Sequence, residues 1–302
     1  MSDVESTTAP VLFADRVVEA VGRKQTQLVV GLDPVADLLP VELRGASSTA
    51  SAVERFCAGI VDAVAPYVVA VKPQVAFFEA LGADGWRALE SVCRYARGAG
   101  LLVIADAKRG DIGSTARAYA TAFLESTPGA APLADALTVN PYLGRDSVDP
   151  FLAACRRDGA GLFVLVRTSN AGARDIQDSI LADGRPVWRH VADLVDDWGE
   201  ELVGDHGLSS VGAVVGATVP RAVAEARKAM PRSIILLPGV GAQGGTPADV
   251  ARAFTSGPAS GLVNASRSVI YAYRDAPDGD WRAAAGQEAA RLSGAIWAAA
   301  GW

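Results

Sequence analysis

The sequence predicts an α/β protein built as a (β/α)8 TIM barrel, with an extra N-terminal helix and a C-terminal helical tail. Short β-branched runs recur eight times along the 302 residues, and helical segments lie between them. Most runs are nearly continuous apolar stretches, as is typical of parallel strands covered on both faces. The eight runs are residues 27–32, 68–72, 101–105, 136–139, 161–166, 211–216, 234–237 and 261–264.

Helical periodicity is clearest at residues 52–65, 86–97, 115–125 and 222–229. The main alternative to the barrel is a doubly wound open sheet. No predicted strand is followed by the GxGxxG sequence that is typical of such sheets, and the count of eight strands fits closure.

The whole chain, residues 1–302, is predicted to form one domain. Residues 1–10 form a flexible tail, residues 11–24 an added helix, and residues 276–302 a packing helix with Leu292, Ile296 and Trp297 at helical spacing. Two Pro/Gly/Ala-rich segments, 127–133 and 174–186, are interpreted as surface insertions, because strand–helix alternation resumes after each.

Composition restricts the class of partner. The chain is 50% hydrophobic and 21% charged, with a formal net charge of −6, which argues against a broad electrostatic interaction with nucleic acid or anionic membrane. No apolar run approaches the roughly 18 residues of a membrane span, and the acidic N-terminus does not resemble a signal peptide. These features predict a cytoplasmic protein with a small-molecule ligand.

Cysteine and histidine usage argues against several site types. Cys57, Cys93 and Cys155 are scattered singly, which indicates neither a disulfide framework nor a zinc site and favours a reducing compartment. His190 and His206 both lie in a polar amphipathic stretch and are interpreted as solvated helix residues. A histidine-based triad or metal cage is therefore not expected.

Charged residues follow the first three predicted strands. Asp33 follows the first strand, Lys72 ends the second, and IADAKRGDI at the end of the third supplies Asp106, Lys108 and Asp111. Asp106 and Lys108 are two apart, so they point to the same side of an extended chain. For Asp106, Lys108 and Asp111 taken alone, a loop stabilised by salt bridges is as good an interpretation as a functional site. If the barrel closes in this order, an alternating Lys/Asp array lines its mouth and can keep Lys108 protonated as an acid.

A phosphate site is predicted after the last two strands. The glycine-rich sequence PGVGAQGG, residues 238–245, follows the seventh strand, and NASRS, residues 264–268, follows the eighth. Glycine loops let backbone N–H groups approach an anion, and these two loops are the usual phosphate site of such barrels. The Arg267 guanidinium would donate two parallel hydrogen bonds to the phosphate oxygens. The ligand is thus expected to be a phosphorylated metabolite.

Taken together, these motifs resemble the orotidine 5′-phosphate decarboxylase family, particularly its longer bacterial type, from about Val29 to Tyr271. The most specific element is the signature D-x-K-x-x-D-I-x-x-T, met by Asp106, Lys108, Asp111, Ile112 and Thr115. The resemblance implies a metal-free, cofactor-free loss of CO₂ from orotidine 5′-phosphate to give UMP, the final step of de novo pyrimidine biosynthesis.

The resemblance also implies roles for the charged residues. Lys108 would donate a proton to C6 of the pyrimidine, Asp106 would lie beside the departing carboxylate, and Lys72 would bridge the array to the ribose. Asp33 would bind ribose hydroxyls. Asp111 and Thr115 would reach the ribose in the partner subunit's site, which makes the expected enzyme a homodimer with shared active sites.

The remaining implied contacts concern the base and the phosphate. Ser169 matches the serine that reads the pyrimidine edge, Gln243 would span base and phosphate, and Gly241, Gly244 and Arg267 would complete the phosphate cup. Around Ser169 the chain departs from many relatives, which have an acidic residue and methionine where Arg167 and Thr168 stand. The segments 127–133 and 174–186 have no counterpart in shorter members.

Three other functions are compatible with parts of the pattern. A 3-keto-hexulose-6-phosphate synthase shares the Asp-Lys-Asp strand end but uses Mg²⁺ and proton transfer. A class I aldolase would need a nucleophilic lysine, whereas two flanking carboxylates should hold Lys108 protonated. A phosphosugar-binding regulator would not need the complete array of Lys72, Asp106 and Lys108.

Overall fold

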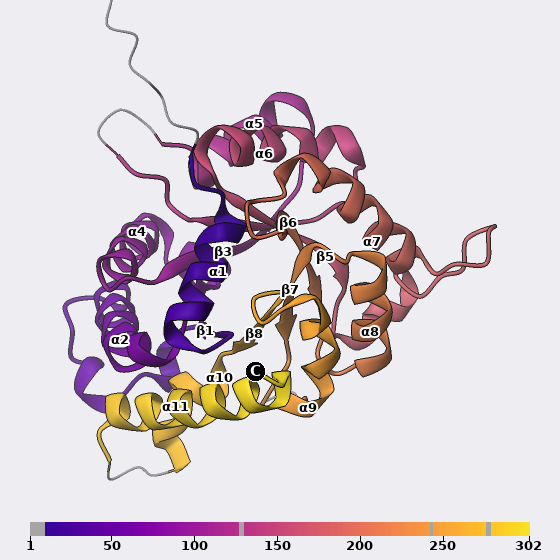
Figure 1. Ribbon diagram of the computed structural model, residues 1–302. Helices are drawn as coiled ribbons and strands as arrows, with labels where there is room; N and C mark the ends of the chain where they lie inside the picture. The colour runs from indigo at the N-terminus through magenta and orange to yellow at the C-terminus, as the bar shows by residue number, and fades with distance from the viewer. Residues whose placement is uncertain (1–9, 127–129, 242–243, 276–278) are drawn as a thin grey trace, which may run out of the picture.

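The computed structural model describes residues 10–126, 130–241, 244–275 and 279–302. Eight parallel strands form a closed barrel in chain order, with β8 paired to β1 (Figure 1). The strands are β1 (Leu28–Leu32), β2 (Ala70–Pro73), β3 (Leu102–Arg109), β4 (Ala136–Val139), β5 (Gly161–Arg167), β6 (Ser209–Val215), β7 (Ser233–Pro238) and β8 (Gly261–Ala265). The predicted barrel and its strand order are confirmed.

Helices surround the barrel and follow most strands (Figure 1). The four predicted helical segments are all found, with their ends shifted by a few residues, at Thr49–Val64, Gly82–Gly98, Gly113–Leu124 and Pro220–Ala229. The helices are α1 (Phe13–Lys24), α2 (Thr49–Val64), α3 (Val75–Glu79), α4 (Gly82–Gly98), α5 (Gly113–Leu124), α6 (Arg145–Asp158), α7 (Val187–Trp198), α8 (Pro220–Ala229), α9 (Pro247–Val250), α10 (Arg267–Ile270) and α11 (Trp281–Ala300).

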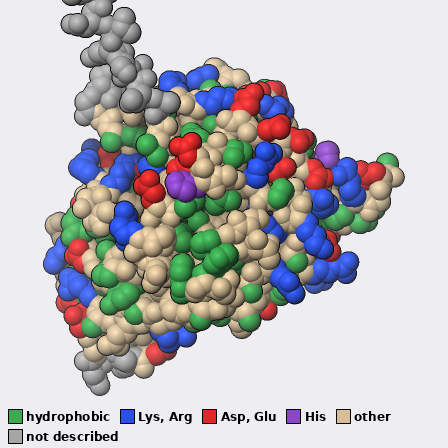
Figure 2. All heavy atoms as spheres, viewed as in Figure 1, with side chains coloured by type: hydrophobic (Ala, Val, Ile, Leu, Met, Phe, Trp, Pro, Cys, Tyr) green, Lys and Arg blue, Asp and Glu red, His purple; other side chains and the backbone are tan. Residues whose placement is uncertain are grey.

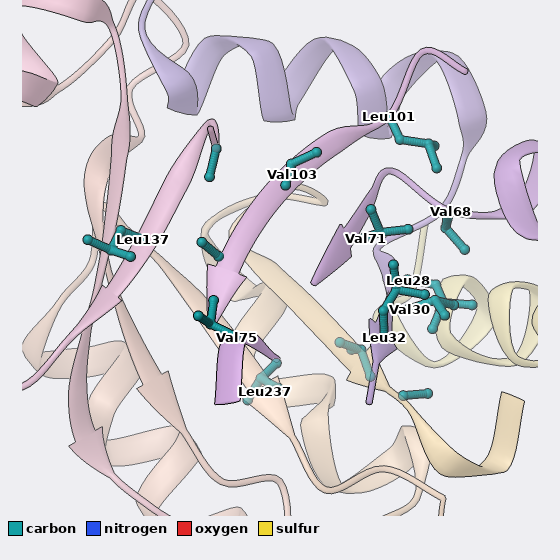
Figure 3. Packing of buried hydrophobic residues seen from close by; sticks show 14 of the residues in the cluster. Leu28, Val30, Leu32, Val68, Val71, Val75, Leu101, Val103, Leu137 and Leu237 are labelled. Atoms are coloured by element: carbon teal, nitrogen blue, oxygen red, sulfur yellow. The ribbon is translucent and has the colours of Figure 1, made fainter. Parts of the chain in front are cut away.

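Apolar side chains pack in two layers. The larger cluster lies between the outer face of the strands and the helices, and Figure 3 shows the part of it that involves β1, β2 and β3. The smaller cluster fills the inside of the barrel and includes Val29, Ile104, Phe163 and Leu262. Because both faces of the strands are covered, their sequences are continuous apolar runs rather than alternating ones.

Helix α1 belongs to the inner cluster and lies across one end of the barrel (Figure 1). The Phe13 ring meets Phe163 edge to face, with centroids 5.9 Å apart. A Cβ on Gly161 would lie 2.3 Å from the Phe13 ring, so this position needs glycine. Arg16 donates to Asp135 at 2.6 Å. The added N-terminal helix therefore closes the amino-terminal end of the barrel and leaves the carboxyl end for chemistry.

The helix α11 packs against the barrel as the predicted C-terminal helix. Trp281 is buried beside the Phe56 ring, with centroids 5.2 Å apart, and Leu292 and Ile296 are buried as their spacing predicts.

The surface on the α1 side carries charges of both signs, mixed with hydrophobic side chains (Figure 2). This face therefore offers no continuous basic field for a nucleic acid. Along the described parts of the chain, no helix combines the length and apolar composition needed to cross a membrane.

The two histidines lie in different settings. His190 is exposed on α7, as predicted. The helical prediction for His206 is wrong: this residue lies in a turn before β6, and its Nδ1 is 2.9 Å from Asp15 Oδ1. Gly207, with φ +79°, follows it and favours a turn over a helix.

All three cysteines are buried and unpaired. Burial raises the pKa of Cys57, and it raises the pKa of Cys93 and of Cys155 to about 12. Since the thiolate is the reactive form, native protein at about pH 8 should be inert to a thiol reagent that readily modifies an ordinary cysteine of pKa about 8.5. Titration with such a reagent should give three thiols after denaturation. Fast modification of a thiol in the folded protein would contradict this burial.

Candidate active site

A cavity of about 500 Å³ opens at the carboxyl ends of the strands. Its wall includes six of the predicted site residues, contributed by strands or loops from β1 to β8: Asp33, Lys72, Asp106, Lys108, Ser169 and Arg267. The topology thus brings together residues that are up to 234 positions apart, as the closed barrel predicts.

Asp106 lies at the centre of the charged array. Its Oδ2 accepts from Lys72 Nζ and its Oδ1 from Lys108 Nζ, both at 2.5 Å. Asp106 and Lys72 are buried, whereas 45% of the Lys108 side chain is exposed. Lys108 is therefore the ammonium group that a ligand in the cavity can reach.

Two polar side chains that the sequence reasoning missed complete the surroundings of Asp106. Thr138 Oγ1 on β4 donates to Asp106 Oδ1 at 3.0 Å, and Gln74 Nε2 after β2 donates to Oδ2 at 3.3 Å. Both line the cavity. Each carboxylate oxygen of Asp106 thus accepts two hydrogen bonds, which fixes the carboxylate plane.

The backbone at Lys108 is unusual. The predicted third strand ends at residue 105, but β3 continues to Arg109, which pairs with Val139 after a shift in register. Within this irregular stretch Lys108 has φ +48°, a left-handed conformation that costs free energy outside glycine. Its N–H donates to Thr138 Oγ1 at 2.9 Å. Asp106 and Lys108 converge as predicted, but through a bulge rather than through simple alternation along a strand.

The charges of the array shift each other's protonation equilibria. Burial alone would raise the pKa of Asp106, but the nearby Lys72 and Lys108 outweigh it and hold this pKa far below its ordinary value. Burial alone would lower the pKa of Lys72, but Asp106 and Asp33 outweigh it and raise this pKa above its ordinary value. Asp106 is therefore a carboxylate and Lys72 an ammonium group at neutral pH.

Asp33 is held next to the array by residues that follow β8. Ser266 Oγ donates to Asp33 Oδ2 at 2.5 Å, and the Tyr271 hydroxyl donates to the Asp33 carbonyl at 3.0 Å. A Cβ on Gly31 would lie 2.8 Å from Ser266 Cβ, so glycine permits this close approach. Asp33 Oδ1 is buried and has no hydrogen-bond partner among the described residues, which is a rare state for a carboxylate oxygen.

The two predicted phosphate loops contribute Gly239, Val240, Ser266 and Arg267 to the cavity wall. Arg267 is exposed, lines the cavity and begins α10. Gly241 and Gly244 have positive φ, as the tight loop requires, but do not line the cavity; their N–H groups donate to Gly245 and Gly241 carbonyls, respectively. Gln243 lies outside the described residues, so its predicted contact stays a prediction.

Asp111 and Thr115 are not brought into this cavity. Thr115 is exposed on α5, and Asp111 lies before that helix, where its Oδ1 accepts from the Ile112 N–H at 2.8 Å. This placement leaves both side chains near the surface of the chain, outside the array that Asp106 organises.

The loop after β5 contributes more than predicted. Besides Ser169, the cavity wall includes Thr168, Asn170 and Gln177. Gln177 belongs to the segment 174–186, so this predicted surface insertion also contributes a side chain to the cavity wall. No local signal in the sequence marks this role, because the same segment also carries Arg174, Asp175, Asp183 and Arg185.

A closed barrel with a lysine–carboxylate array at the carboxyl ends of its strands defines an enzyme of the (β/α)8 class. The chain belongs to the orotidine 5′-phosphate decarboxylase / HUMPS family, whose sequence model matches residues 26–279. The resemblance found in the motifs is thereby confirmed.

Similar proteins cover nearly the whole chain. The orotidine 5′-phosphate decarboxylase of Rhodopirellula baltica is 48% identical over 270 residues, 87% of this chain and 89% of the relative. That of Roseiflexus sp. is 45% identical and covers 95% of this chain and 98% of the relative. The structure of Leishmania donovani OMP decarboxylase superimposes with a TM-score of 0.75 at 32% identity, covering 97% of this chain and 100% of that one.

Proposed function

We propose that the protein decarboxylates orotidine 5′-phosphate to UMP and CO₂, the final step of de novo pyrimidine biosynthesis. The observation that carries this proposal is the array at the barrel mouth, in which the buried Asp106 carboxylate is held between Lys72 and Lys108. The high identity to named decarboxylases over most of the chain supports the same conclusion.

The array suits a reaction that develops negative charge on carbon. Breaking the bond between C6 and the carboxylate leaves an electron pair on a ring carbon, and CO₂ departs. The exposed ammonium group of Lys108 attracts this carbanion more strongly than it attracts the delocalised carboxylate of the substrate, and only that difference accelerates the step. Lys108 then gives a proton to C6 and regains one from solvent.

The buried members of the array orient Lys108. Asp106 holds its ammonium group at 2.5 Å and would lie beside the departing carboxylate. Lys72 and Asp33 extend the array toward the side of the cavity where ribose hydroxyls would bind, and the Asp33 carboxylate is the expected acceptor. Ser169, across the cavity, would read the pyrimidine edge, and Gln243 would span the base and phosphate.

We assign the phosphate to the loops after β7 and β8, where Arg267 lines the cavity and Gly241 and Gly244 shape the tight turn of the first loop. Arg267→Ala should weaken binding of UMP by about 1.5–3 kcal/mol, or about 10- to 150-fold, because a charge-assisted contact is lost. Calorimetry with UMP measures this loss. Arg274→Ala is the matched control, since Arg274 is also exposed but does not line the cavity. Normal UMP binding by Arg267→Ala would show that the phosphate lies elsewhere.

We further propose a homodimer with shared active sites. Asp111 and Thr115 would contact the ribose in the partner subunit's site, which agrees with their position outside this chain's own cavity. Three large apolar side chains near them, Ile112, Tyr142 and Leu143, are 55%, 79% and 49% exposed. They follow β3 and β4, which are paired, so they present an apolar surface suited to a second copy.

The proposed enzyme works as one domain in the cytoplasm, where its three unpaired thiols match a reducing environment. The proposal makes no use of a cofactor. A metal-dependent synthase of the same family is the second candidate, but a divalent cation at Asp106 would face two ammonium groups that already occupy both carboxylate oxygens.

Ultraviolet absorbance tests the proposed reaction, because decarboxylation changes the pyrimidine chromophore. Micromolar protein mixed with orotidine 5′-phosphate should convert it fully, with UMP as the product by chromatography. Absence of any conversion would overturn the proposed function.

A further inference from the structure

We propose that Gln177 and Asp178 are positioning residues that hold the loop presenting Ser169, and that they thereby set the affinity of the site for the pyrimidine rather than for the phosphate. The two residues lie between β5 and α7, directly after Ile176 and a short 3-10 helix (Ala171–Asp175). This inference rests on the proposed function, because it takes the cavity beside Ser169 as the place of the base.

Gln177 is bonded to the residue just before Ser169. Its Oε1 accepts from the Thr168 N–H at 2.8 Å, and its Nε2 donates to Thr168 Oγ1 at 2.9 Å. The Thr168 hydroxyl in turn donates to Asn170 Oδ1 at 2.6 Å, on the other side of Ser169. The Gln177 amide thus fixes both the backbone and the side chain of Thr168, and the Thr168 hydroxyl links it to Asn170 on the other side of Ser169.

Asp178 secures the same loop at the last residue of β5, Arg167. The Arg167 guanidinium donates to Asp178 in a bidentate pair, with both N–O distances 2.9 Å. Arg167 is buried, and its carbonyl accepts from the Gly216 N–H at 2.8 Å. Because the Asp178 carboxylate compensates the burial of the Arg167 charge, this pair ties the segment that carries Gln177 to the end of β5.

The loop is confined from the opposite side by the end of β6. A Cβ on Gly216 would lie 2.9 Å from Ser169 Cβ and 3.0 Å from Ser169 N, so the two backbones are in close contact. The end of β6 thus contacts Ser169 directly, while Gln177 holds the neighbouring Thr168.

Gln177 itself is held by backbone bonds. Its N–H donates to the Ala173 carbonyl at 2.8 Å, and its carbonyl accepts from the Trp188 N–H at the start of α7 at 2.9 Å. Beyond this anchored part, the chain projects from the body of the molecule in a turn closed by an antiparallel bridge between Ile180 and Pro186 (Figure 1). The positioning role belongs to the anchored part, and the projecting turn supplies a control.

The test compares a ligand that has the base with one that lacks it. In Gln177→Leu, the affinity for UMP should fall about tenfold, as expected for the loss of a side-chain hydrogen-bond pair, whereas the affinity for ribose 5-phosphate should stay within about twofold. Asp178→Asn, which keeps its size and one acceptor, should lower UMP affinity by about fivefold and also spare ribose 5-phosphate. Asp183→Asn, in the projecting turn, is the matched control and should change neither affinity.

Amide hydrogen exchange provides a second readout that needs no ligand. Peptides covering residues 168–170 should exchange faster in Gln177→Leu and Asp178→Asn, while peptides from β4 remain unchanged. The inference is overturned if both folded variants bind UMP normally, or if UMP and ribose 5-phosphate lose affinity equally. Wild-type protein that neither binds UMP nor converts orotidine 5′-phosphate would instead overturn the proposed function.

Discussion

Lys108→Ala should lose at least about 10⁴-fold in turnover of orotidine 5′-phosphate, while its affinity for UMP stays within about threefold. The loss combines two effects of one ammonium group, charge stabilisation of the carbanion and proton transfer to C6. UMP binding survives because the proposed base and phosphate contacts, Ser169 and Arg267, lie on other loops. The buried pair of Lys72 and Asp106 also remains intact.

Stopped-flow absorbance and calorimetry on the same preparation measure both quantities. Lys228→Ala is the control, because Lys228 is an exposed lysine on α8 that does not line the cavity, and it should keep full activity. If Lys108→Ala retained most of its turnover, Lys108 could not be the proton donor. A parallel loss of UMP binding would mean that Lys108 acts in binding rather than in the chemical step.

A mixture of Lys108→Ala and Asp111→Ala chains should recover activity that neither variant has alone. In a two-fold dimer with shared sites, each site takes Lys108 from one chain and Asp111 from the other. A mixed dimer therefore has one site with both substitutions and one with neither. With random reassortment half of the dimers are mixed, so roughly a quarter of all sites should be intact.

The experiment needs exchange of subunits, which native mass spectrometry of differently tagged chains can verify. Two differently tagged Lys108→Ala preparations, mixed in the same way, serve as the control and should remain inactive. Verified exchange without recovered activity would place Asp111 in its own chain's site. The exposed apolar residues Ile112, Tyr142 and Leu143 would then need another explanation.

The sequence alone predicts the barrel well because the signal is carried by whole strands. Eight apolar runs mark the eight strands, and their order fixes which loops meet at the mouth. The contacts of Asp106 with Lys72 and Lys108 follow from that order. Their detailed geometry does not, because the left-handed backbone at Lys108 arises from the register shift between β3 and β4.

The residues that sequence reasoning missed are polar side chains whose role depends on tertiary contact. Thr138 lies within an apolar strand, and only the position of β4 beside β3 brings its hydroxyl to Asp106. Gln177 lies in a segment with the composition of a surface loop. Only the return of this segment to Thr168 brings the amide to the cavity, and no local pattern encodes that return.

Turnover of orotidine 5′-phosphate by enzyme held in excess EDTA tests most directly whether this array decarboxylates without metal. We expect stoichiometric release of CO₂ and formation of UMP at a rate that EDTA does not change and added Mg²⁺ does not raise. Loss of activity in EDTA that Mg²⁺ restores, or conversion of a keto-hexulose phosphate in place of orotidine 5′-phosphate, would contradict a decarboxylase that relies on Lys72, Asp106 and Lys108 alone.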